Sequence, residues 1–126
     1  MDLSKISNAD DGAVMELQYA GKVVRKEDGS PVTIKLAGMD STKWRKARNS
    51  LFNRSIKTAK PNQQKTAEQN IDEDSELLAS VTISWDGISD KGQDLECNFA
   101  NAKKVYLEYD WLREQVSAFV QQRENF

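Results

Sequence analysis

The sequence predicts an α+β fold: an N-terminal antiparallel β-hairpin or small sheet, followed by about four α-helices, with a flexible central linker. Three observations lead to this prediction. Apolar and polar residues alternate up to residue 36, and apolar residues recur at helical spacing from residue 40 onward. Residues 60–72, KPNQQKTAEQNID, contain almost nothing that can be buried. A chain of 126 residues suits one domain rather than two.

The strands are expected near the N-terminus. Residues 1–12 are polar and acidic, which predicts a flexible arm, and a single domain is expected over 13–126. Alternation with a period of two predicts strands over Met15–Tyr19 and Val32–Leu36. The turn formers of KEDGSP precede the second of these, so Val23–Arg25 is expected to pair with it as a hairpin. Met15–Tyr19 would then be a neighbouring strand.

A basic helix follows the strands. Asp40 or Ser41 can cap its free N–H groups. The helix should end near residue 59, because Pro61 disfavours helical geometry in the residue before it. The apolar stripe expected on this helix consists of Trp44, Ala47, Leu51 and Ile56, with Arg48 and Phe52 at its border.

A second helix is expected after the linker. The residues that could cap it are Asp72, Asp74 and Ser75. Leu77, Val81 and Trp85 have the spacing i, i+4, i+8, which places them on one face of a helix. Gly87 would end this helix in the left-handed conformation, leaving Trp85 as its last core contact.

Two further helices are expected to complete the chain. A turn at residues 90–92 leads through a short extended piece, 95–99, to a third helix that Asn98 can cap. Asp110 can cap the fourth helix. The apolar positions of these two helices are Ala102, Val105, Tyr106, Tyr109, Leu112, Val116, Phe119 and Val120.

The composition argues against several classes of function. There is no histidine, and the one cysteine, Cys97, cannot form an intramolecular disulfide and is expected to be a small core residue. No glycine-rich phosphate loop, catalytic pair or metal-ligand cluster occurs in the sequence. The carboxylates of 72–76 and of Asp86, Asp90 and Asp94 lack the spacing of a calcium loop. We therefore expect no enzyme, no cofactor and no metal site, and no apolar run approaches the ~20 residues that span a bilayer.

A run of positive charge is the strongest functional signal. Eight Lys and Arg residues lie between Ser41 and Ala67 with no acid among them, although the formal net charge is −2. Such a run could bind a phosphate backbone, could bind an acidic protein, or could be a solvated face. No nucleic-acid motif accompanies it, so nucleic acid is not the expected partner. The residues predicted to bind a protein partner are Lys43, Arg45, Lys46, Arg48 and Arg54. Their counterpart could lie on a client protein or on another copy, where the acidic segment 72–76 is one candidate.

Two long stretches carry a family resemblance. The sequence of residues 28–54 predicts a hairpin that ends in G-x-D-S and leads into a basic helix. The sequence of residues 77–126 predicts, in order, an apolar helix ending in W-x-G, a turn, an extended polar piece, a helix opened by N-A, a W-L-x-x-Q-V helix and a terminal N-F. In the order and spacing of these motifs the chain resembles the tail assembly chaperones of long-tailed (siphovirus-type) bacteriophages.

The resemblance implies a protein that binds the tape measure protein, keeps it soluble and helps recruit tail tube subunits. It also implies self-association, action in the host cytoplasm and absence from the mature virion. The alternative is a structural component of the virion, such as a minor tail or head–tail joining protein. A nucleic-acid-binding regulator is a weaker alternative that depends only on the basic helix.

Overall fold

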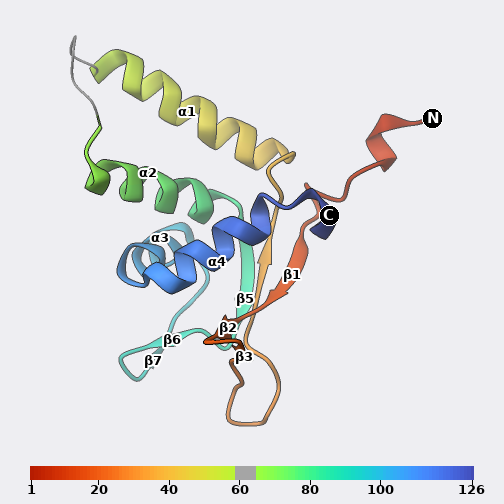
Figure 1. The fold of residues 1–126 in the computed structure, drawn as a ribbon, viewed down its shortest axis with the longest axis vertical. Coiled ribbons are helices and arrows are strands. Elements are labelled where there is room, and N and C mark those ends of the chain that lie inside the picture. Colours follow the sequence, from red (N-terminus) through yellow and green to blue (C-terminus); the bar gives the residue numbers. More distant parts are fainter. Residues whose placement is uncertain (59–64) are drawn as a thin grey trace.

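The computed structural model describes residues 1–58 and 65–126, and it confirms an α+β fold with four α-helices and antiparallel sheets in this part of the chain (Figure 1). The helices are α1 (Thr42–Thr58), α2 (Ala67–Ser80), α3 (Phe99–Glu108) and α4 (Asp110–Val120), with short 3-10 helices at Leu3–Lys5 and Arg123–Asn125. The strands are β1 (Ala13–Glu16), β2 (Gln18–Tyr19), β3 (Lys22–Val23), β4 (Thr33–Leu36), β5 (Thr82–Asp86), β6 (Ser89–Asp90) and β7 (Gln93–Asp94).

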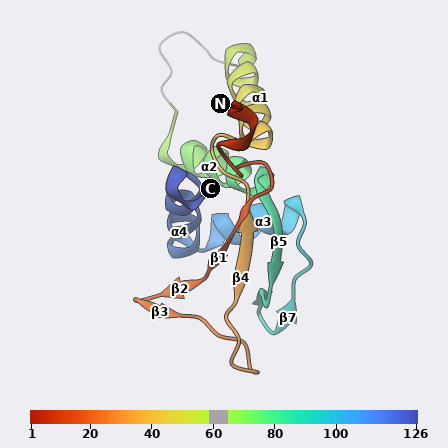
Figure 2. The same cartoon turned by 90° about the vertical axis from the view of Figure 1, so that its right-hand side faces the viewer.

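A three-stranded antiparallel sheet with the order β1-β4-β5 organises the fold. Met15 lies opposite Ile34, and Ile34 lies opposite Trp85, so these three residues share one face of the sheet. Helices α2, α3 and α4 lie together on one side of the sheet (Figures 1 and 2). The pairs β2–β3 and β6–β7 form two small ribbons at the end of the sheet farther from α1.

The core lies between the sheet and the helices. Its fully buried large side chains include Ile34, Leu36, Leu78, Val81, Tyr106, Val116 and Val120. The hydroxyl oxygens of Tyr106 and Thr82 are 2.7 Å apart, so this deeply buried phenol has a hydrogen-bond partner. Burial also raises the pKa of Tyr106, which keeps the phenol protonated at neutral pH.

The predicted hairpin of Val23–Arg25 with Val32–Leu36 is wrong in part. The main ladder joins β4 to β1, whereas β3 pairs with β2. The chain reverses before β3, in a two-residue turn whose residues Ala20 and Gly21 both have positive φ. Between the two predicted hairpin arms, the Val32 N–H donates to the Val24 carbonyl at 2.9 Å, and Arg25 forms an isolated antiparallel bridge with Pro31, just before the second arm.

The second helix begins and ends earlier than predicted. Its cap is Thr66, whose hydroxyl accepts a hydrogen bond from the Gln69 N–H at 3.1 Å. The Gln69 side chain in turn accepts from the Thr66 N–H at 2.8 Å, which completes a capping box. The predicted linker, 60–72, is therefore wrong for 67–72, which is helical. Positions 60–64 of that prediction lie outside the described residues.

Trp85 lies in strand β5 and not at the end of a helix. Its ring shares the inner face of the sheet with Ile34, and its indole N–H donates to the Leu95 carbonyl at 2.8 Å. The stretch VTISW satisfies both the helical spacing and the strand alternation, and the β-branched residues favour the strand once β4 is available as a partner. Gly87 has the predicted left-handed conformation, at φ +89°, but it follows a strand.

The predicted flexible arm, residues 1–12, packs against the domain in its second half. Ala9 is only 3% exposed, and the Asn8 N–H donates to the carbonyl of the last residue at 3.0 Å. Gly12 lies so close to the sheet that a Cβ there would be 2.7 Å from the Ile83 side chain. The sequence does not anticipate this packing of residues 8–12 against the domain.

The last two helices agree closely with prediction. Asn98 caps α3, with its side chain accepting from the Asn101 N–H at 2.8 Å. Asp110 is the first residue of α4 rather than its cap, and its carboxylate pairs with Arg113 at 2.7 Å. The predicted apolar residues that are buried are Ala102, Val105, Tyr106, Leu112, Val116 and Val120.

Candidate protein-binding surface

Helix α1 is the least buried of the four helices. None of its residues from 42 to 57 is buried, whereas α2, α3 and α4 each have several buried residues. Ser41 caps the helix by accepting from the Trp44 N–H at 3.2 Å, and Asp10 accepts from the Thr42 N–H at 2.6 Å. The helix lies along α2 and extends away from the sheet (Figure 1).

The apolar stripe predicted for α1 is correct for Trp44, Ala47 and Leu51, which are half-buried. It is wrong for Ile56, which is 62% exposed. Ile56 follows Leu51 by five residues, and at about 100° per residue it lies about 140° around the helix from Leu51. Phe52, placed at the border of the stripe by its spacing, is also on the outside and is 64% exposed.

Ile56 and Phe52 share the outer face of α1 with two arginines. Arg45, Arg48, Phe52 and Ile56 have the spacing i, i+3, i+7, i+11, which aligns them along one face. All four are exposed. We call them the α1 stripe: its N-terminal half is cationic and its C-terminal half is apolar.

The five residues predicted to bind a partner fall into two groups. Lys43, Arg45, Lys46 and Arg48 are exposed and make no salt bridge within residues 1–58 and 65–126. Arg54 instead pairs with Glu76 of α2 at 2.7 Å. The first four side chains are available to a partner, and Arg54 helps to hold α1 against α2.

The acidic segment 72–76 is largely engaged within the chain. The ion pairs that use it are Asp72 with Lys103 (3.3 Å), Glu73 with Lys65 (2.8 Å) and Glu76 with Arg54 (2.7 Å). A carboxylate that already has a cationic partner gains less interaction free energy from a second cation. This segment is therefore a poor counterpart for the α1 cations of another copy. These pairs join different elements, so sequence spacing does not reveal them.

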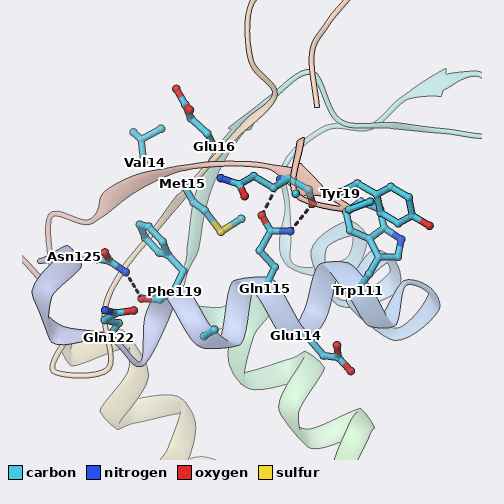
Figure 3. Close-up of a pocket in the computed structure, with 14 residues that line it drawn as sticks. Val14, Met15, Glu16, Tyr19, Trp111, Glu114, Gln115, Phe119, Gln122 and Asn125 are labelled. Carbon is cyan, nitrogen blue, oxygen red and sulfur yellow. Dashed lines mark hydrogen bonds between the residues drawn. The ribbon is translucent and has the colours of Figure 1, made fainter. Parts of the chain in front are cut away.

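A groove between β1–β2 and α4 is a second candidate surface (Figure 3). It is open and has a volume of about 990 Å³. The rings of Tyr19 and Trp111 meet edge to face at its end, with centroids 5.1 Å apart. The Gln115 amide donates to the Gln18 carbonyl at 2.7 Å and accepts from the Gln18 N–H at 2.8 Å, as a neighbouring strand would.

The lining of this groove combines apolar, amide and acidic side chains. Tyr19 is 59% exposed and Trp111 is 37% exposed, although both are large aromatic residues. Glu16 and Glu114 also line the groove, and none of its lining residues is Lys or Arg. We call this feature the α4 groove. Sequence reasoning missed it because β1 and α4 are separated by almost the whole chain.

The pKa values of Tyr109, which lines a second cavity, and of Cys97 are both raised. This cavity, of about 900 Å³, lies between β5–β6 and the junction of α3 with α4. A hydrogen bond to Asp90 raises the pKa of Tyr109, which lines it. Burial raises the pKa of the Cys97 thiol, so this half-buried cysteine stays protonated at neutral pH.

The part of the chain that the structure describes contains no group of three or more acidic, Cys or His side chains placed to hold a metal ion. Within the same residues, no helix has both the length and the apolar character needed to cross a bilayer. No protein-family model, curated protein or solved structure matches the chain.

Proposed function

We propose that this protein is a tail assembly chaperone of a long-tailed bacteriophage. It binds the tape measure protein stoichiometrically, keeps it soluble and helps to recruit tail tube subunits. It acts in the host cytoplasm, uses no cofactor or catalytic step, and is absent from the mature virion. The order of motifs over residues 28–54 and 77–126 is the reason for naming this family.

The α1 stripe is the observation that supports binding to such a client. A tape measure protein is a long coiled coil whose apolar seams aggregate in water until tube subunits enclose them. Phe52 and Ile56 offer apolar contacts to a seam of this kind. Arg45 and Arg48 can pair with the acidic side chains that flank coiled-coil seams. A helix lying on a helix is a common mode of recognition, and α1 presents an uncovered face for it.

Co-expression with the tape measure protein tests the proposal, with the soluble fraction of the client as the readout. We expect the wild-type chain to keep the client soluble and to co-purify with it. Changing both Phe52→Ser and Ile56→Ser should weaken binding by on the order of 100-fold or more, since each buried side chain contributes about 1.5–3 kcal/mol. The charge reversals Arg45→Glu and Arg48→Glu should also weaken it.

The matched control reverses two exposed cations outside α1, Lys5→Glu and Lys104→Glu. This control should bind the client as the wild type does. A client that stays insoluble with the wild-type chain would refute the proposal. Finding the protein at a fixed copy number in purified particles would favour the alternative of a structural virion component.

A further inference from the structure

We propose that, when no client is bound, the α1 stripe of one copy docks into the α4 groove of a second copy, so that copies join head to tail. The proposal combines two surfaces that are exposed on the same chain and have complementary chemistry. One is a cationic and apolar helix face, and the other is a groove lined by aromatic, amide and acidic side chains without Lys or Arg.

The charge of the chain is strongly divided between these two regions. Residues 41–66 carry eight Lys and Arg and no acid, so the rest of the chain carries ten Lys and Arg against twenty Asp and Glu. The α4 groove belongs to this acidic remainder. Its charged lining residues are Glu16 and Glu114, which no salt bridge among the described residues neutralises. Arg45 and Arg48 of another copy are cations of the kind that these carboxylates attract.

The apolar parts of the two surfaces also match. Phe52 and Ile56 are each more than 60% exposed. The α4 groove offers Tyr19 and Trp111 as an exposed aromatic pair. The groove is open to solvent and has a volume of about 990 Å³. Large aromatic residues are also the side chains that most often anchor protein interfaces.

Charge disfavours a symmetric pairing of either surface with itself. Two α1 helices face to face would oppose six cations with six cations, because α1 contains no acid. Two α4 grooves would likewise oppose acid with acid. The groove lining includes no residue of α1, and α1 and β2 lie at opposite ends of the molecule (Figures 1 and 2). The stripe and the groove therefore meet between copies, in a heterologous contact that forms a row or a ring.

In this arrangement self-association and client binding compete for the α1 stripe. The competition rests on the proposed function, which assigns the client to the same stripe. Docking between copies would cover Phe52 and Ile56 until a client is available. A client that binds the stripe more tightly than the groove does would release single copies from the row.

Sedimentation velocity over a range of concentrations tests the head-to-tail contact. The stripe variant carries Phe52→Ser and Ile56→Ser, and the groove variant carries Glu16→Lys and Glu114→Lys. All four positions are exposed, so both variants should keep the wild-type circular dichroism spectrum. We expect the average sedimentation coefficient of the wild type to rise with protein concentration. For each variant alone, the dissociation constant for self-association should be at least ten-fold higher.

The mixture of the two variants is the decisive sample. In the mixture, the groove variant supplies an intact stripe and the stripe variant supplies an intact groove. The two chains should therefore form a 1:1 dimer and nothing larger. A chain that combines the groove variant with Arg45→Glu and Arg48→Glu should regain self-association, because both charges of the contact are exchanged. A wild type that stays monomeric, a variant that associates like the wild type, or a mixture that stays monomeric would each overturn the proposal.

Client binding by the same variants separates this inference from the proposed function. The groove variant should still keep the tape measure protein soluble, whereas the stripe variant should not. If the stripe variant solubilises the client normally but does not self-associate, the contact between copies stands and the client assignment fails. If the groove variant loses the client as well, the client requires the assembled row, and the competition between them is refuted.

Discussion

Replacing Gly12 with alanine should destabilise the protein strongly, because two independent penalties coincide at this residue. Gly12 has φ +88°, a conformation that costs an L-residue about 1–2 kcal/mol. A Cβ there would also lie 2.7 Å from the Cδ1 of Ile83 and 2.8 Å from the carbonyl oxygen of Leu36. The carbonyl belongs to the central strand and cannot move aside without disturbing the sheet, so this overpacking should add about 1–3 kcal/mol.

Gly21→Ala is the matched control. Gly21 has a similar φ, +80°, but a Cβ there would meet nothing within 4 Å. Gly21→Ala should therefore lower the free energy of unfolding only through the backbone conformation, by about 1–2 kcal/mol. Gly12→Ala should lower it by about 2–5 kcal/mol. The difference between the two variants measures how tightly residues 8–12 pack against the sheet.

Urea unfolding followed by tryptophan fluorescence can measure both free energies of unfolding. We expect the two variants to keep the wild-type m-value and to differ in their midpoints, with that of Gly12→Ala the lower. Equal midpoints would mean that the close approach to Ile83 and Leu36 does not exist in solution. The view that the second half of the predicted arm packs against the domain would then lose its main support.

Two further predictions test contacts at helix ends. Thr66→Ala removes the capping box of α2 and should lower the free energy of unfolding by about 1 kcal/mol in urea titrations; no loss would argue against a helix start at Ala67. A hydrogen bond from Arg123 lowers the pKa of the Asp40 carboxyl below its ordinary value of 3.8. The pair therefore stabilises the fold fully at pH values above the pKa that Asp40 has in the unfolded chain. This stabilisation is lost as the pH falls through the lower pKa that Asp40 has in the folded protein. The stability difference between the wild type and Asp40→Asn, from urea midpoints at several pH values, should therefore be constant above about pH 5 and disappear toward about pH 2. A difference that persists undiminished at the acidic end would contradict this reasoning.

The parts of the fold that can be predicted from the sequence are those that depend on neighbours along the chain. Apolar residues at helical spacing identified the buried faces of α3 and α4, and the Asn98 side chain caps α3 as predicted. Gly87 has the left-handed conformation that the sequence predicts for it. Helix faces, caps and turns involve residues a few positions apart, so their energies can be judged locally.

Whether Trp85 belongs to a helix or a strand depends on contacts between elements that are distant in the chain. The stretch VTISW satisfies both periods, and the strand prevails because β4 offers it a hydrogen-bonded partner and Leu95 accepts its indole N–H. The position of Ile56 on the outside of α1 follows from helix geometry, but that face remains open only because no described element covers it. The α4 groove likewise exists because β2 and α4, almost a hundred residues apart, meet through Gln18 and Gln115. Contacts of this range depend on how every intervening element packs, and no local pattern encodes that outcome.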